Sequence, residues 1–184
     1  YEKVIDDETG LPKPGHFSSM KDYSIRDRSC YDATMCHLVK DCAERLGLRN
    51  PIDFDYQKLI LENYWNGSYF LDDLSGKNYV AGDAQVWPFW TGIFSDKAMK
   101  RKVIDTLKEH GLDSPLPLKY TAEDNKEVDM ILIEMFASDW EKHVCWTHMG
   151  PLYIKMVKSV RPALAGKYIE IYKTYIEKYK NYVE

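Results

Sequence analysis

Apolar residues recur at helical spacing in several separate stretches of this 184-residue chain, and no other feature constrains the fold as strongly. Over 31–46 an apolar stripe suits one face of an amphipathic helix, which Gly47 can end. Similar stripes occupy 55–65, 99–107 and 163–183. The sequence therefore predicts an all-α fold of about six or seven helices joined by loops.

The remaining helices are predicted from their start and stop signals. One spans about 84–94, with Pro88 early in it, where a missing N–H is best tolerated. The next has Ser95 as its N-cap and Gly111 as its stop. A further helix follows Gly150, before the last and longest one.

The predicted loops are rich in glycine, proline and polar residues. Residues 1–29 show neither helical nor strand period and are expected to form an extended N-terminal loop. We expect a loop or small hairpin over 69–79 and a connecting loop over 112–120. The apolar run 128–136 fits either a buried helix turn or a strand. The length suits a single domain over residues 1–184.

Charge and composition exclude several classes of partner. The net charge of −4 and the scattered lysines argue against nucleic acid. No run of 18 apolar residues is present and no basic-then-apolar leader opens the chain, so we expect no membrane partner. The four cysteines lack a Cys-x-x-Cys pair, which favours free thiols in a reducing, cytoplasmic setting.

Aromatic and acidic residues concentrate in the predicted loops, most densely over 63–94. Aromatic faces stack on sugar rings, while carboxylates and amides bond to sugar hydroxyls, so this composition favours a carbohydrate site. For His148 the alternative is a local structural role near a helix start. The candidate substrate-binding residues are Tyr31, Tyr69, Asp72, Asp73, Asp83, Trp87, Trp90, Trp146 and His148.

Carboxylates are the chemistry that the sequence leaves available. Asp32 falls in the first turn of a predicted helix, where it either caps the helix or acts as a catalytic acid. Asp72 and Asp73 suggest an aspartate-rich metal motif, but Gly76 leaves that motif incomplete, and the histidines lack ligand spacing. We therefore expect neither a metal nor an organic cofactor.

Four segments together resemble a known family. Ser29–Thr34, Tyr69–Asp73, Gly82–Gly92 and Trp146–Tyr153 are similar, in order and spacing, to the loops of trehalases, processing α-glucosidases and amylo-α-1,6-glucosidases. In the last segment Thr-His-Met replaces the arginine region of the family's loop. The resemblance covers nearly the whole chain from residue 18 onward.

The resemblance implies both a fold and an activity. Those relatives form an (α/α)6 toroid of six helical hairpins, so this chain resembles the C-terminal part of one. The rest of the toroid, or another chain, would complete it. The resemblance makes Asp32 the general acid and Glu184, in the segment Lys180–Glu184, the general base of an inverting glycosidase. Its expected substrates are α-linked gluco-oligosaccharides or a related glycoside.

Two other functions fit the same residues. One is a non-catalytic carbohydrate-binding or regulatory helical module, which keeps the aromatic cleft but lacks a complete carboxylate pair. The other is a helical scaffold whose aromatic residues are core and whose partners are proteins. Glu184 is then an ordinary charged residue at a helix end. The position of the tryptophans, in an open cleft or packed between helices, separates these readings.

Overall fold

The computed structural model describes residues 4–18, 21–49, 53–122, 135–136 and 142–180. Within these ranges two short strands precede six helices, so the predicted all-α class is confirmed in its coarse form. The elements are β1 (Pro14–Ser18), β2 (Lys21–Asp27), α1 (Cys30–Arg45), α2 (Tyr56–Asn63), α3 (Gly82–Trp90), α4 (Lys97–Glu109), α5 (Met149–Lys158) and α6 (Pro162–Tyr179).

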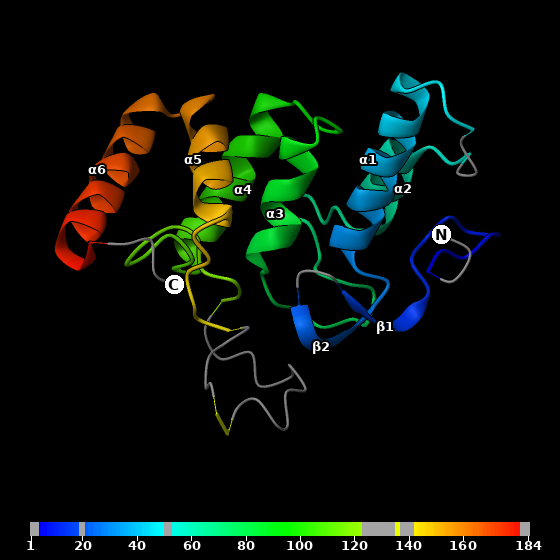
Figure 1. The fold of residues 1–184 in the computed structure, drawn as a ribbon, viewed down its shortest axis with the longest axis horizontal. Coiled ribbons are helices and arrows are strands. Elements are labelled where there is room, and N and C mark those ends of the chain that lie inside the picture. Colours follow the sequence, from blue (N-terminus) through cyan, green and yellow to red (C-terminus); the bar gives the residue numbers. More distant parts are fainter. Residues whose placement is uncertain (1–3, 19–20, 50–52, 123–134, 137–141, 181–184) are drawn as a thin grey trace.

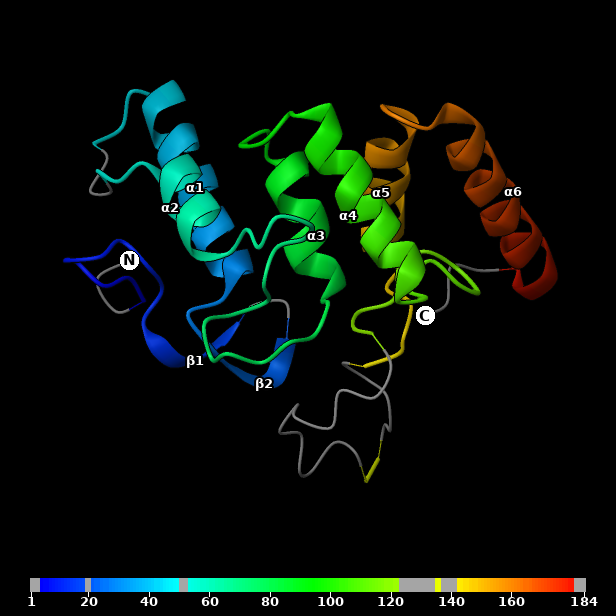
Figure 2. The same ribbon diagram turned by 180° about the vertical axis from the view of Figure 1, so that it is seen from behind.

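The helices stand side by side in a row (Figure 1). Helix α1 packs against α2 and α3, α3 packs against α5, and α5 packs against α4 and α6. The pair α1 and α2 lies at one end of the row and α6 at the other, an order that the reverse view in Figure 2 repeats. Successive helices therefore form hairpins, and α3 occupies the middle of the molecule.

The long connections gather at one end of this row. The β1–β2 hairpin, the later part of the segment 64–81 and the segment 110–122 lie near the lower ends of the helices in both views, where α1, α3 and α5 begin (Figures 1 and 2). The first part of the segment 64–81 runs alongside α3, where Phe70 packs against Phe89 and Phe94. The short connections, over 91–96 and 159–161, lie at the opposite end. Because α1, α3 and α5 all begin at the loop end, the residues of their first turns share that end of the molecule.

The core is strongly aromatic and joins the loop end to the helices. Among its fully buried side chains are Tyr64, Phe70 and Tyr120 from the loops. Phe70 packs against Phe89 of α3 and against Phe94, with ring centroids 5.9 and 5.3 Å apart. Such rings supply much of the apolar area that drives folding. The segment 64–81 is therefore held in place by core packing as well as by polar contacts.

The N-terminal region corrects the prediction of an extended loop over 1–29. Residues 14–18 and 21–27 pair as antiparallel strands, in which the register shifts between Pro14 and His16 and again between Phe17 and Ser18. These irregularities break the alternation of side chains that identifies a strand in a sequence. The buried Arg26 in β2 also hides the strand pattern, because a charged residue normally marks the solvent face.

Two details of the predicted helices are wrong. Pro88 is the seventh of nine residues in α3, not an early one. Asp96, not Ser95, caps α4, where its side chain accepts a hydrogen bond from the backbone N–H of Met99 at 2.6 Å. Both carboxylates and hydroxyls cap helices well, so the sequence Ser-Asp leaves the choice between neighbours open.

The undecided run 128–136 lies outside the described residues except for Met135 and Phe136, which are exposed.

In α6 the predicted tyrosine face is only partly buried. Tyr168 lies in the core, whereas Tyr175 and Tyr179 are exposed. None of the helices in the described ranges has the length and apolarity needed to cross a bilayer.

Candidate functional site

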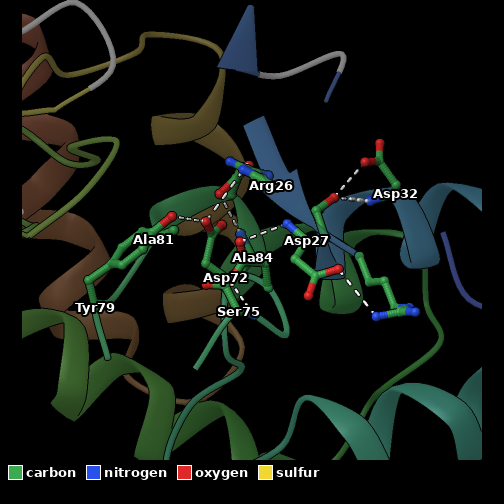
Figure 3. A network of polar contacts seen from close by, with 12 residues as sticks. Arg26, Asp27, Asp32, Asp72, Ser75, Tyr79, Ala81 and Ala84 are labelled. Carbon is green, nitrogen blue, oxygen red and sulfur yellow. Dashed lines mark hydrogen bonds and ion pairs between the residues drawn. The ribbon is translucent and has the colours of Figure 1, made fainter. Parts of the chain in front are cut away.

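A buried charge cluster lies at the loop end of the helix row (Figure 3). Arg26, from β2, donates from Nη2 to Asp83 Oδ2 at 2.8 Å, and its Nε lies 3.4 Å from Asp72 Oδ2. The Tyr79 hydroxyl donates to the same Asp72 oxygen. One arginine thus joins the β hairpin, the segment 64–81 and the first turn of α3.

The electrostatics of this cluster follow from its burial. Burial opposes the charge on Arg26, but the carboxylates of Asp72 and Asp83 outweigh this and raise its pKa further above its ordinary value. Two carboxyl groups thus face one buried guanidinium. Removing one member of such a cluster leaves a buried charge uncompensated, which costs about 3–5 kcal/mol.

Asp72 and Asp83 were predicted to contact sugar, and the structure also gives them a structural role. Their side chains are only 1% and 0% exposed; Asp72 contacts Arg26 and Tyr79, and Asp83 contacts Arg26 and the Ala84 backbone N–H. In this structure both residues hold the loop end together. Their contact with sugar stays a prediction.

Asp73 also has a structural position. Its Oδ2 accepts a hydrogen bond from the Asp27 backbone N–H at 3.0 Å, and its Oδ1 accepts one from the Ser75 hydroxyl at 2.6 Å. Two backbone bonds, from Cys30 to Asp72 and from Leu74 to Asp27, complete the attachment. The segment around Asp73 is thereby fastened to the junction between β2 and α1.

Asp32 lies just beyond this junction, in the first turn of α1. Ser29 is the N-cap, and its hydroxyl both accepts from the Asp32 backbone N–H at 3.0 Å and donates to Asp32 Oδ2 at 2.6 Å. Asp32 thus takes part in capping, as one of the two sequence readings proposed. In Figure 3 its carboxyl group lies at the edge of the network, apart from Arg26 and Asp72.

The half-buried setting of Asp32 favours its protonated form. Burial raises the pKa of the Asp32 carboxyl group, the Ser29 hydroxyl and the Arg26 charge act in the opposite direction, and Asp83 and Asp72 add to the rise. A carboxyl group with a raised pKa can hold a proton nearer to neutral pH and deliver it. This is the chemistry that a general acid requires.

Tyr31, the residue before Asp32, packs against an aromatic ring of α3. Tyr31 and Trp87 meet edge to face with centroids 5.8 Å apart, which links the first turn of α1 to α3. Trp87 in turn meets Trp90 at 5.1 Å. Trp87 is partly exposed, whereas little of Tyr31 reaches the surface. Of the predicted substrate-binding residues, Tyr31 directly precedes Asp32 in the chain, and Asp83 and Asp72 influence its pKa.

Trp90 ends α3 and lies at the far end of that helix from the loops. It is 46% exposed and lines a surface pocket of about 180 Å³ between α3, α4 and α5. Lys100, Lys155 and Ser159 line the same pocket. The structure thus separates Trp90 from the loop end, where the prediction had placed it.

The other candidates begin α5 or belong to the segment 64–81. Trp146 contacts Tyr120 and His148, with centroids 5.4 Å away in both cases. His148 occupies the N-cap position of α5, is exposed and makes no capping bond with its side chain. Tyr69 is partly buried against the core. Trp146 and His148 lie at the loop end, where α5 begins, whereas Tyr69 adjoins Phe70, which packs against Phe89, further along α3, and against Phe94.

Glu184, the predicted base, lies outside the described residues, so its distance from Asp32 stays a prediction.

Three residues of the site, Arg26, Ser29 and Tyr79, were not predicted from the sequence. The Ser-x-x-Asp spacing before the apolar run of α1 is a capping signal that identifies Ser29. Arg26 gave no such signal, because its partners lie 46 and 57 residues further along the chain.

All four cysteines are free thiols, and no group of three or more metal-ligating side chains is found among the residues that the structure describes. No family model matches the chain, and no curated protein matches it either.

Proposed function

We propose that the chain is part of a glycoside hydrolase that cleaves α-linked gluco-oligosaccharides, with Asp32 as the general acid. The observation that carries this proposal is the setting of Asp32: a half-buried carboxyl group with a raised pKa, in the first turn of α1, held by the Ser29 hydroxyl at 2.6 Å. The resemblance of four segments to trehalases and α-glucosidases supports the same assignment.

In the proposed reaction Asp32 protonates the glycosidic oxygen while its bond to the anomeric carbon breaks. Glu184, as the base, removes a proton from the water that attacks that carbon from the opposite face. An inverting pair of this kind needs a separation of about 6.5–9.5 Å to admit the water. Proton transfer between carboxyl groups, sugar and water completes this reaction, so the proposal assigns it neither a metal nor an organic cofactor.

The arrangement of the hairpins supports an (α/α)6 toroid as the complete fold. A row in which α1 adjoins α3 and α3 adjoins α5 is compatible with half of such a ring. Both ends of the row expose apolar side chains, including Val39 of α1 and Ile169, Tyr175 and Tyr179 of α6. We propose that further hairpins, from the same protein or another chain, cover these ends. The free cysteines support a cytoplasmic location.

One observation favours the alternative, a non-catalytic carbohydrate-binding module. Trp90 presents an exposed ring in a pocket that lies away from Asp32, and an exposed tryptophan is a stacking surface for a sugar. Calorimetry with glucose, maltose and trehalose separates the two functions. Binding that Trp90→Ala abolishes, without release of reducing sugar, would favour the module.

The glycosidase proposal is tested with maltose, isomaltose and trehalose on the intact protein. We expect Asp32→Asn and Glu184→Gln each to lower kcat by about 10²–10⁴-fold, which is the usual contribution of general acid or base catalysis. Asp41→Asn, a carboxylate on the same helix as Asp32 that pairs with Arg45 at 2.9 Å, is the control and should keep the wild-type rate. Near wild-type hydrolysis in either of the first two variants would remove that residue from its role.

A further inference from the structure

The Ser29 hydroxyl makes two bonds to the same residue. It accepts the Asp32 backbone N–H at 3.0 Å, which is the ordinary function of an N-cap, and it donates its only proton to Asp32 Oδ2 at 2.6 Å. Capping requires the acceptor role alone. The donor role is additional, and it acts on the carboxyl group proposed to move a proton.

Ser29 is itself held rigidly. It is 1% exposed and lies at the junction of β2 and α1, which Asp73 and the backbone bond from Cys30 to Asp72 fasten to the segment 64–81. A hydroxyl held in this way fixes the direction of the carboxyl group that it contacts. Asp32 Oδ2 faces Ser29, so Oδ1 is the oxygen on the other side of the group.

We propose that Ser29 is a positioning residue for Asp32: its hydroxyl holds Oδ2 and leaves Oδ1 as the oxygen that carries the transferable proton. This inference rests on the proposed role of Asp32 as a general acid. It adds which atom delivers the proton and which residue orients it. A proton carried on Oδ1 points away from Ser29, whereas one on Oδ2 would compete with the serine bond.

Other charged and titratable groups surround Asp32 and define the background of the test. Arg26 comes from β2, Asp72 from the segment 64–81 and Asp83 from α3, and all three influence its pKa. Tyr64, at the end of α2, and Cys36, one turn further along α1, also interact with its charge. Each of these remains in place when only the Ser29 hydroxyl is removed.

The test is a carbon-13 NMR titration of the aspartate carboxyl groups in the intact protein, with the Asp32 signal assigned by Asp32→Asn. The Ser29 bond favours the charged form of Asp32, so its removal should raise the pKa of that carboxyl group. Ser29→Gly is the main variant, because glycine is itself a tolerated N-cap and lacks the hydroxyl. Ser29→Ala removes both the cap and the hydroxyl.

Ser75→Ala is the matched control. Its hydroxyl donates to Asp73 Oδ1 at the same distance of 2.6 Å, so the substitution removes an equivalent bond from a neighbouring carboxylate. We expect the pKa of Asp32 to rise in Ser29→Gly and Ser29→Ala and to stay unchanged in Ser75→Ala. An unchanged pKa of Asp32 in Ser29→Gly would overturn the proposal. If neither serine variant folds, NMR coupling constants of the Asp32 side chain in the wild-type protein test the proposal instead. A single rotamer would support the positioning role, and free averaging between rotamers would overturn it.

The pH dependence of activity provides a second test, because loss of the helix cap alone should not change it. In Ser29→Gly the alkaline limb of the pH–rate profile should shift to higher pH, because a general acid with a higher pKa stays protonated longer. We expect kcat to fall about tenfold with KM nearly unchanged, since the proton is no longer held toward the glycosidic oxygen. A profile that keeps its alkaline limb would contradict the positioning role. If no variant or wild-type protein hydrolyses any glycoside, the glycosidase proposal fails, while the NMR result still decides whether Ser29 controls Asp32.

Discussion

At the scale of single residues, Asp32 is placed where its charge is unfavourable. Burial and the nearby carboxylates of Asp83 and Asp72 disfavour ionisation, while only Ser29 and Arg26 favour it. A surface carboxylate capping a helix would cost the fold nothing at neutral pH. Sites that carry such a cost commonly serve function, because stability and activity make opposite demands on them.

This cost predicts a change of stability with pH. The pKa of Asp32 in the folded protein is raised above its ordinary value of 3.8. The protonated carboxyl group therefore stabilises the fold below pH 3.8, and this stabilisation is lost as the pH rises through the folded-state pKa. Asp32→Asn, which is neutral at every pH, should therefore increase the free energy of unfolding at pH 7 and lose this gain at acidic pH. Urea unfolding of both proteins across this range measures it.

The control for that prediction is Asp41→Asn, further along α1. Asp41 pairs with the exposed Arg45 at the helix surface, and such pairs contribute at most about 1 kcal/mol. This variant should be equal to or slightly less stable than the wild type at pH 7. A loss of stability at pH 7 in Asp32→Asn as well would show that the Asp32 charge is not unfavourable in the folded protein.

At the scale of elements, the starts of α3 and α5 are set by close approach to the segment 110–122. A Cβ atom at Gly82 would lie 2.5 Å from the Lys119 carbonyl oxygen, and one at Gly150 would lie 2.5 Å from that of Pro117 and also meet the Tyr172 hydroxyl. Tyr172 of α6 donates a hydrogen bond to the same Pro117 carbonyl. The absence of a side chain at Gly150 thus allows α5, α6 and the loop to meet.

Gly150→Ala is expected to destabilise the protein by about 1–3 kcal/mol, because the added methyl group must displace Tyr172 or the loop backbone. Gly166→Ala in α6 makes the same chemical change where nothing lies within 4 Å, so it should stabilise by about 0.5–1 kcal/mol. Chemical denaturation of both variants tests the packing. If both substitutions changed the free energy of unfolding in the same direction, the close approach at Gly150 would be contradicted.

Much of the element structure could be predicted from the sequence. The stripes behind α1, α2 and α4 have helical spacing, and the glycines at 47 and 111 adopt the positive φ that ends a helix. The β1–β2 hairpin could not be predicted, since its register is irregular and Arg26 interrupts its pattern. For the site, the sequence indicated Asp32, but it did not show that Asp72 and Asp83 pair internally with a distant arginine.

At the scale of the whole molecule, the hairpins bring together residues that are far apart in the chain. The starts of α1, α3 and α5 lie at the same end as the long connections, with Asp32, Asp83 and His148 in or beside those first turns. Residues on loops and helix ends held by a rigid frame are a common arrangement for binding and catalysis. The same frame places Trp90 at the opposite end of α3, away from this region.

The most direct test of the account compares Asp32→Asn with the wild type on two α-glucosides that differ only in their leaving group. Maltose must receive a proton as its bond breaks, whereas a dinitrophenyl α-glucoside releases a stable anion without one. If Asp32 is the proton donor, its loss should slow maltose hydrolysis by about 10²–10⁴-fold and dinitrophenyl release by less than about tenfold. Equal losses on both substrates, or no loss on maltose, would contradict the central claim.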